Sequence, residues 1–309
     1  MNEKNALKVE KLTKIYSNKS EKEIRALNNL NLEVKEGEIF GLLGPNGAGK
    51  TTFINILGGT VVKTSGKVDV WDFDLDINPR QVRASVGIVP QEVNLDPFFS
   101  PRKLLEFQAG LYGVKKDDRI TDDILKLVSL ESHADSYARS LSGGMKRRLL
   151  MAKALVHQPP IIILDEPTAG VDVELRKNLW ENVKSLNTQG VTIILTTHYL
   201  EEAEKMCDRI GILNKGSLVA LDSTVNLLER IQTKKVTFKV NKKVEINDKT
   251  LKSLQILYNR ENEICVSYEK SKTNIQEVID FIKKKNIEIN DISTDDGYLE
   301  DVFLRLIKN

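Results

Sequence analysis

The sequence predicts an α/β fold with a buried, largely parallel sheet, followed by a small α+β domain. Three apolar, β-branched runs, at 86–89, 161–164 and 191–196, show no alternation of polar and apolar residues. This is typical of strands that are buried on both faces of a parallel sheet. A glycine-rich loop at 44–51 lies between a further apolar run and an amphipathic segment, as in a strand–loop–helix unit. Together these features favour an α/β core.

A change in composition divides the chain near Arg230. All eight prolines lie at or before Pro167, and seventeen of the eighteen glycines lie at or before Gly216. The residues that follow are rich in lysine and poor in turn formers. We therefore expect a first domain over 1–230 and a second over 231–309, with no internal repeat.

The elements of the first domain follow in order. Residues 38–43 read as a strand, and a helix is expected from about Lys50. Apolar residues recur at helical spacing between 95 and 137, which predicts a helical insertion and a helical subdomain of about 95–150; they are Leu104, Leu105, Leu111, Ile124, Leu125, Leu127 and Val128. Residues 210–213 and 218–221, separated by a turn with Gly216, predict a hairpin.

The second domain shows both periodicities. Residues 236–240 and 264–268 are expected to be strands. Apolar residues at i, i+3, i+4 and i+7 predict one helix over 275–282 and another over 299–306. A small α+β domain is the natural interpretation, and no glycine-rich loop or acid–base cluster indicates a ligand site in it.

Composition limits the classes of function. The chain has 309 residues and 40% apolar residues, and 46 basic residues nearly balance 44 acidic ones. This balance gives no reason to expect nucleic acid as a partner. Cys207 and Cys265 lack metal-site spacing, the N-terminus shows no signal peptide, and no apolar run approaches the roughly 20 residues of a membrane span. We therefore expect a soluble chain whose partner, if it acts at a membrane, does the spanning.

The loop at 44–51 fits the phosphate-binding pattern at every fixed position: Gly44, Pro45, Asn46, Gly47, Ala48, Gly49, Lys50 and Thr51. Small residues let backbone N–H groups close around phosphate oxygens. Lys50 is expected to bridge the β- and γ-phosphates, Thr51 to offer a hydroxyl to Mg²⁺, and Thr52 to join the binding loop. The alternative is a glycine-rich turn without a ligand, which is rare for a full match in this context.

Polar residues also follow three of the expected buried strands. Asp165 and Glu166 end the run at 161–164, where Asp165 is expected to hold Mg²⁺ through water and Glu166 to polarise the attacking water. Taken alone, they are as easily a helix-capping pair before Pro167. His198 follows the run at 191–196, although an isolated histidine is usually structural. Gln91, after 86–89, can reach Mg²⁺ or water, or be an ordinary loop residue.

Two further features belong to the expected nucleotide site. Ser142, Gly143 and Gly144 open a helix at its N-cap, which gives a second set of N–H groups for a phosphate. Such a segment indicates that a second copy of the chain completes the site. Tyr16 is a candidate for stacking on adenine, but tyrosines at strand ends are common.

The set resembles the ATP-binding cassette (ABC) transporter ATPases, over residues 6 to about 225. The motifs that carry the resemblance occur in the family's order: Tyr16, the loop 44–51, Gln91, the signature 141–145, the pair Asp165 and Glu166, the turn 169–172 and His198. Met145 stands where the family usually has glutamine, a departure familiar in its type 2 exporter branch. The segment 298–304 resembles the C-terminal helix of drug, polysaccharide and ion exporters of that branch.

The resemblance implies a P-loop NTPase core with an antiparallel N-terminal β subdomain. It implies a head-to-tail homodimer around two ATP, with Asp172 near the partner's site, that drives a separate integral membrane permease. The expected location is cytoplasmic, peripheral on the inner face of the cell membrane. Non-transport regulation of a soluble complex and an importer ATPase are the alternatives, and the transported substrate is not encoded in this chain.

Two surface features have competing interpretations. The stretch 95–99, which contains Phe98 and Phe99, is a plausible contact for the permease, but core packing is at least as good an interpretation for either ring. The cations Lys146, Arg147 and Arg148 near the start of the signature helix are more typical of a solvated face than of a nucleic-acid patch.

Overall fold

The computed structural model describes residues 4–17, 23–169, 171, 173–231, 233–241, 254–284, 287–295 and 297–308. The chain divides into two compact units, Met1–Asp222 and Ser223–Asn309. Each unit has its own hydrophobic core. The division between the units lies just before a short helix, α8 (Thr224–Glu229), whereas the compositional boundary near Arg230 lies just after it.

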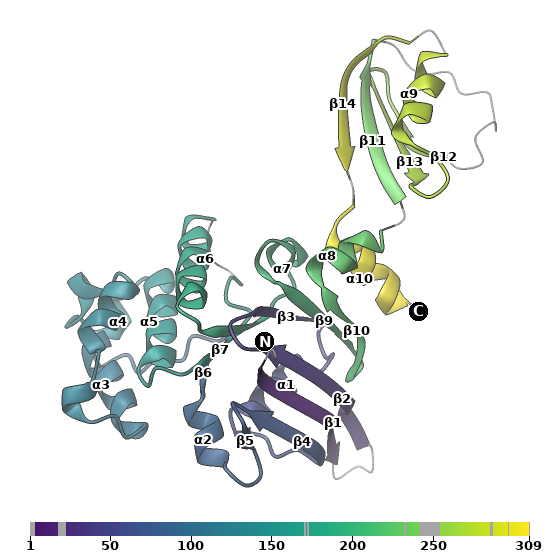
Figure 1. Cartoon of the computed structure of the whole chain (residues 1–309). Helices are drawn as coiled ribbons and strands as arrows, with labels where there is room; N and C mark the ends of the chain where they lie inside the picture. Colours follow the sequence, from purple (N-terminus) through teal and green to yellow (C-terminus); the bar gives the residue numbers. More distant parts are fainter. Residues whose placement is uncertain are drawn as a thin grey trace. The chain divides into compact units, whose positions relative to one another are not determined.

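A mixed six-stranded sheet forms the centre of the first unit, in the order β10-β9-β3-β8-β7-β6 (Figure 1). Its strands are β3 (Ile39–Leu43), β6 (Val86–Val89), β7 (Ile161–Asp165), β8 (Thr192–Thr196), β9 (Arg209–Asn214) and β10 (Ser217–Ser223). The pairs β3·β8, β3·β9, β6·β7 and β7·β8 are parallel. Every residue of β3, β7 and β8 is buried, which confirms the predicted burial on both faces for the strands in the runs 161–164 and 191–196. In β6, for which the same was predicted, Ile88 is half-buried.

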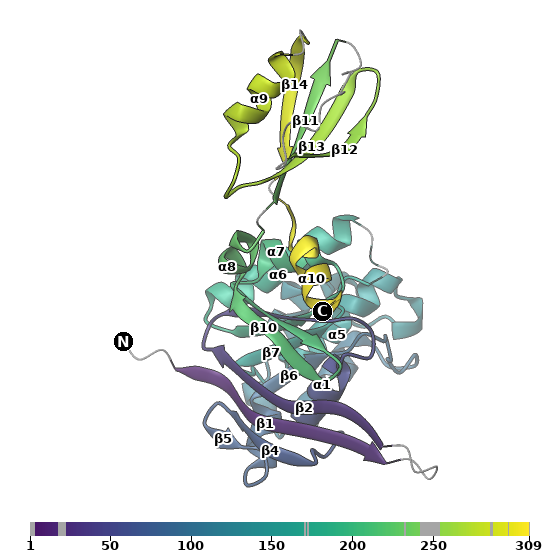
Figure 2. The same ribbon diagram turned by 90° about the vertical axis from the view of Figure 1, so that its right-hand side faces the viewer.

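A second sheet in this unit is antiparallel and has the order β2-β1-β4-β5. Its strands are β1 (Asn5–Ser17), β2 (Glu23–Lys35), β4 (Ser65–Val70) and β5 (Phe73–Asp74). Helix α1 (Lys50–Leu57) contacts β2 of this sheet and β7 of the central one. Its buried side chains, among them Phe53 and Leu57, join residues of both sheets in one core. Figure 2 shows the strands β1, β2 and β4 of this sheet side by side.

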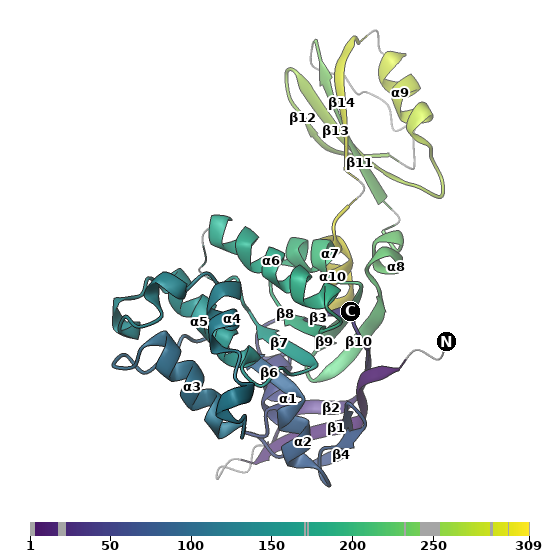
Figure 3. The same cartoon turned by 60° about the vertical axis from the view of Figure 1, so that its left-hand side comes forward.

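A helical segment packs beside β6, as the apolar spacing predicts (Figure 3). It contains α3 (Pro101–Leu111), α4 (Thr121–Leu127) and α5 (Gly143–Leu155), joined by 3₁₀ turns at Lys116–Asp118, Glu131–His133 and Ala138–Ser140. The three helices contact one another, and α5 contacts β6. Helix α2 (Pro79–Ala84) leads into β6, while α6 (Val173–Thr188) contacts β8 and α7 (Leu200–Met206) contacts β3.

The second unit is an α+β structure. Its antiparallel sheet has the order β12-β13-β11-β14, made of β11 (Thr233–Val240), β12 (Leu254–Asn259), β13 (Glu263–Glu269) and β14 (Ile289–Asp295). Helix α9 (Ile275–Lys283) places Val278 and Ile282 on this sheet, and α10 (Leu299–Lys308) contacts α8. The strands β11 and β13 and both helices were expected. The edge strands β12 and β14 were not, because most of their residues are exposed or half-buried and show no alternation.

Candidate active site

The glycine-rich loop joins β3 to α1 at the end of the central sheet. Gly47 and Gly49 have φ of +79° and +112°, a region of backbone conformation that favours glycine. A Cβ on Gly44 would lie 2.4 Å from the carbonyl oxygen of Leu213, so a side chain has no room there. Gly47 has open space around its Cα. The loop is therefore packed on its inner side and open where a phosphate can approach the backbone N–H groups.

Lys50 begins α1 and is 7% exposed. Its Nζ donates hydrogen bonds to the carbonyl oxygens of Gly44 at 2.6 Å and Pro45 at 3.3 Å. Burial lowers the pKa of Lys50, while the nearby carboxylates of Glu166 and Asp165 raise it in part. The lysine, the loop and the two carboxylates thus form one electrostatic group, in which the ammonium is held inside the curve of the loop.

Asp165 lies at the carboxyl end of β7, paired in register with Thr196 of β8. The Thr196 hydroxyl donates a 2.6 Å hydrogen bond to Oδ1 of Asp165, and Asp165 is 7% exposed. Burial raises the pKa of Asp165, and the neighbouring Glu166 raises it further, whereas Thr196 and Lys50 lower it. A second oxygen of this carboxylate remains for a cation or a water.

Glu166 follows directly, in a left-handed backbone conformation with φ of +49°. Its N–H donates to the carbonyl oxygen of Thr196 at 3.0 Å, which turns the side chain out of the strand direction. Oε2 of Glu166 contacts Nδ1 of His198 and accepts a 3.3 Å hydrogen bond from the His198 backbone N–H. The glutamate side chain is 8% exposed and the histidine side chain is 52% exposed. The pair therefore joins a buried carboxylate to an accessible ring.

Gln91 follows β6, next to β7 in the sheet, so it starts from the same sheet edge as Asp165. It is exposed, and its backbone carbonyl is held by Nη1 of Arg147 at 2.7 Å. Thr51 is exposed on the first turn of α1, and Thr52 is half-buried beside it. Together with Asp165, these residues offer hydroxyl, carboxylate and amide oxygens.

These oxygen donors fit Mg²⁺. Among the described residues, no group of three or more histidine, cysteine, aspartate or glutamate side chains can hold a metal ion by itself. Mg²⁺ is commonly bound through one or two carboxylates, with water and substrate phosphates completing its octahedron. The oxygens of Asp165, Thr51 and Gln91 are therefore of the kind that Mg²⁺ takes beside a nucleotide.

The second phosphate-binding segment lies at the start of α5. Ser142 is the N-cap, and its hydroxyl accepts a 3.3 Å hydrogen bond from the backbone N–H of Met145. Ser142 and Gly143 are exposed, Gly144 is half-buried, and a Cβ on Gly143 would meet nothing within 4 Å. Because the first N–H groups of a helix have no partner within it, this end of α5 can receive an anion.

The remaining candidate residues are Tyr16 and Asp172. Tyr16 lies in β1, in the antiparallel sheet, and is 38% exposed, with Nζ of Lys14 4.6 Å from its ring centre. Its ring is accessible to a base, and among the described residues no hydrogen bond, ion pair or ring contact joins it to the loop at 44–51. Asp172 lies outside the described residues, as does Gly170.

Sequence patterns did not indicate two sets of residues that hold this site. Arg147 donates to the carbonyl oxygens of Gln91 and, at 2.9 Å, of Ala169. Arg148 donates to those of Val128 and Ser129 at 2.9 and 2.8 Å. The expectation of a solvated face is therefore wrong for these two arginines, because both side chains satisfy carbonyl groups of other segments. Thr168, Thr196, Thr197 and Glu202 form the second set, and only the pairing of β7 with β8 could have indicated Thr196.

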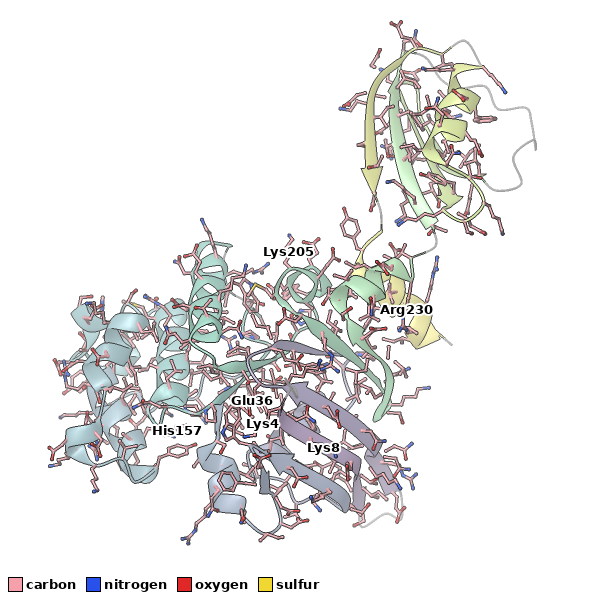
Figure 4. The ribbon with its side chains drawn as sticks, viewed as in Figure 1. Lys4, Lys8, Glu36, His157, Lys205 and Arg230 are labelled. Atoms are coloured by element: carbon pink, nitrogen blue, oxygen red, sulfur yellow. The ribbon has the colours of Figure 1, made fainter. Side chains whose placement is uncertain are left out.

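A cavity of about 240 Å³ lies between the central sheet and the helical segment. Parts of α1, α2, β6, α3 and α5 line it, including Pro90, Tyr112 and Lys153. The stacked rings of Tyr112 and His157 lie at this boundary, where Figure 4 labels His157. Phe98, Phe99 and Phe107 are 67%, 49% and 68% exposed, so core packing does not explain the first two rings.

Comparison with known proteins agrees with this geometry. Residues 27–169 match the model of the family described as ABC transporter. The chain is 37% identical over 227 residues to the linearmycin resistance ATP-binding protein LnrL of Bacillus subtilis, covering 73% of this chain and 71% of that protein. It is 43% identical over 205 residues to the Nod factor export ATP-binding protein I of Rhizobium sp., covering 66% of this chain and 67% of that protein.

Solved structures show the same fold. A dimeric ATP-binding cassette in a post-hydrolysis state, bound to ADP and Pi, superposes with a TM-score of 0.63 at 30% identity. The match covers 71% of this chain and 98% of that one. The CbiO1 subunit of a Clostridium perfringens ABC transporter complex gives a TM-score of 0.64 at 27% identity, covering 74% and 95%. The described helices of this chain include none with the length and apolar character that a membrane crossing requires.

Proposed function

This chain belongs to the ABC transporter family of ATP-binding proteins and is an ATPase, and we propose that it drives a separate membrane permease of an exporter. The observation that supports this best is one constellation at the edge of the central sheet. A phosphate-binding loop, a buried lysine, two carboxylates and a histidine lie at the ends of β3, β7 and β8. Ligands bind at this edge in open α/β sheets.

In this proposal each catalytic group has a role, and the geometry of the site supports it. Water attacks the γ-phosphorus of ATP, its proton passes to the carboxylate of Glu166, and ADP leaves with the phosphoanhydride oxygen. His198 orients this carboxylate through its ring nitrogen and its backbone N–H. Lys50 and the loop N–H groups stabilise the charge on the phosphate oxygens. Gln91 is placed to orient the water or the metal.

Mg²⁺ is the metal that the oxygen donors of Thr51, Asp165 and Gln91 fit, and when bound it neutralises charge on the β- and γ-phosphates. Asp165 is the buried member of this set, and the Thr196 hydroxyl fixes its orientation at 2.6 Å. Tyr16 offers its exposed ring to the adenine base.

A second copy of the chain completes the site in this proposal. The start of α5 is an anion-binding helix end, formed by Ser142, Gly143 and Gly144. It is far in the sequence from the loop at 44–51 and belongs to a different element. In a head-to-tail dimer, this end of one copy faces the γ-phosphate bound by the other, with Asp172 near the interface. The dimer closes only while ATP makes contacts that differ between the open and closed states.

The membrane partner docks on the helical segment. The cavity beside α3 and α5 has a size suited to one or two side chains of an incoming helix, and the exposed aromatic side chain of Tyr112 lines it. Phe107 and Leu111 lie one turn apart on α3 and are both 68% exposed. Exposed apolar side chains that gather in this way mark interaction sites. Export, rather than import, is supported by the names of the relatives, a resistance protein and an export protein.

The catalytic assignment is tested with Glu166→Gln. The amide keeps the size of the side chain but cannot accept the proton of the attacking water. We expect kcat for ATP hydrolysis to fall by about 10²–10⁴-fold while ATP affinity stays within about twofold. With Mg-ATP, sedimentation should then show a stable species of two chains. Turnover at the normal rate would refute the role of Glu166.

The partner is tested by affinity purification of tagged Glu166→Gln protein from detergent-solubilised membranes with Mg-ATP. An integral membrane protein should co-purify, and Lys50→Ala protein serves as the control that does not form the closed dimer. Recovery of a ribosomal or other soluble complex instead would support the regulator hypothesis and contradict the permease.

A further inference from the structure

Glu202 is a buried acidic residue outside the constellation described above. It lies in the first turn of α7 and is 7% exposed. Its neighbour Glu201 is exposed and pairs with Lys205 at 4.0 Å, on the outer side of α7, where Figure 4 labels Lys205. Burial raises the pKa of Glu202, so the folded protein keeps this carboxylate at a cost in free energy. An apolar residue could pack α7 at this position without that cost.

One oxygen of Glu202 links the two loops that carry the catalytic pair. Oε2 accepts a hydrogen bond from the hydroxyl of Thr168 at 2.7 Å and a weaker one from the hydroxyl of Thr197 at 3.4 Å. Both threonines are fully buried. Thr168 follows Glu166 by two residues, and Thr197 directly precedes His198. The carboxylate therefore holds the segment after β7 against the segment after β8.

The other oxygen of Glu202 faces α6. Nε of Arg176 lies 3.3 Å from Oε1, an ion pair without hydrogen-bond geometry. The same guanidinium lies 5.1 Å from the ring centre of Tyr199, and the ring of Tyr199 lies 4.0 Å from that of His198. Glu202 thus reaches His198 by two routes, through Thr197 along the chain and through Arg176 and Tyr199 across side chains.

We propose that Glu202 is a positioning residue for ATP hydrolysis, which fixes the contact between Glu166 and His198 by holding Thr168 and Thr197 together. This inference rests on the proposed roles of Glu166 and His198. The contact itself joins residues 32 positions apart, and one of its members, His198, is more than half exposed. Without Glu202, the two loops have fewer constraints, and a shift of about 1 Å in a catalytic group can cost about 100-fold in rate.

The test compares Glu202→Ala, Glu202→Gln and the matched control Glu201→Ala in the purified full-length protein. We expect Glu202→Ala to lower kcat by about 10- to 100-fold with KM for ATP within about twofold, because the phosphate loop is unchanged. Glu202→Gln keeps an oxygen that accepts from Thr168, so it should restore most of kcat. Glu201→Ala should behave as wild type.

Thr168→Val provides a second route if Glu202→Ala does not fold. Valine has nearly the shape of threonine, and this change removes only the hydroxyl that donates to Glu202. It should also lower kcat with KM unchanged, as measured beside circular dichroism and thermal unfolding. A folded Glu202→Ala or Thr168→Val protein with wild-type kcat would overturn the inference, and so would a rise in KM with kcat unchanged.

Glu166→Gln, measured in the same assays, separates this inference from the proposed function. If Glu166→Gln abolishes turnover while Glu202→Ala does not reduce it, only the role of Glu202 is wrong. If Glu166→Gln turns over normally, the catalytic assignment itself is wrong, and the Glu202 inference falls with it.

Discussion

Adjacent carboxylates at the end of β7 have different surroundings, which suit the different roles proposed for them. Asp165 continues the strand and accepts a hydrogen bond from the Thr196 hydroxyl. Glu166 leaves the strand in a left-handed conformation and meets His198. The first suits a cation, because its carboxylate is fixed and buried beside Lys50. The second suits a base, because its partner ring is accessible to solvent.

Lys50→Ala tests the phosphate loop at the scale of one residue. The change removes a cation that lies inside the loop and is expected to bond phosphate oxygens. We expect the affinity for ATP to fall by about 10- to 100-fold, the equivalent of one or two charge-assisted hydrogen bonds, as measured by calorimetric titration. Lys8→Ala, at a half-buried lysine of β1 that pairs with Glu10 and that Figure 4 labels, is the control and should bind ATP normally. Unchanged affinity in Lys50→Ala would contradict the nucleotide assignment.

The raised pKa of Asp165 makes a prediction about pH. Because burial raises the folded-state pKa, the folded protein binds this proton more tightly than the unfolded chain does. The Asp165 carboxyl group therefore contributes its full stabilisation at pH values below the ordinary aspartate pKa. This contribution is lost as the pH rises through the raised pKa of the folded protein. At neutral pH, Asp165→Asn, which keeps an acceptor for Thr196, should unfold at a higher temperature than wild type in EDTA without nucleotide.

The difference between wild type and Asp165→Asn should shrink as pH falls through the window between the raised pKa and the ordinary one. Thermal unfolding at several pH values measures it. A difference that grows on acidification would show that the sign of the shift is wrong.

At the scale of elements, α5 is joined to the rest of the unit through its arginines. Arg147 binds carbonyl oxygens 56 and 22 residues away, and Arg148 binds carbonyl oxygens 20 and 19 residues away. Burial lowers the pKa of Arg147, which reflects the water it loses in this position. The helix that carries Ser142 at its start is thereby tied to the segment after β6 and to the loop after Glu166.

Arg147→Ala should therefore destabilise the first unit. Loss of its hydrogen bonds to Gln91 and Ala169 should lower the free energy of unfolding by about 1–3 kcal/mol, measured by urea denaturation. Lys146→Ala removes the preceding cation of the same helix and serves as the control, with an expected change within about 0.5 kcal/mol. Equal effects of the two changes would contradict a specific role for Arg147.

At the scale of the whole chain, two units have separate cores. Phe53 and Phe40 lie in the core of the first and Phe238 in that of the second, and all three are fully buried. Such units can unfold separately, since each has its own cooperative core. The part that matches the ABC transporter family model, residues 27–169, and the proposed catalytic constellation lie in the first unit.

Calorimetry should show two unfolding transitions. ATP in excess should raise the unfolding temperature of the first unit only. At 100 times Kd, ATP adds about 2.7 kcal/mol to the free energy of unfolding of that unit. Phe238→Ala should lower the unfolding temperature of the second unit only, with a loss of about 3–5 kcal/mol in its free energy of unfolding. A single transition that responds to both ATP and Phe238→Ala would show that the units unfold as one.

Short-range sequence patterns were enough to predict much of this protein's structure. The all-buried strands, the loop at 44–51, the N-cap at Ser142 and the helices α9 and α10 depend on neighbours within a few residues, so the sequence alone predicts them. Tertiary structure decided the contacts between distant residues. It determined that Thr196 binds Asp165, that Arg147 binds Gln91, and that Glu202 holds the loops of Glu166 and His198. Thr196 and Asp165 meet because β7 and β8 are parallel neighbours, whereas Arg147 and Glu202 reach their partners from helices. No spacing along one chain records which of these distant segments will meet.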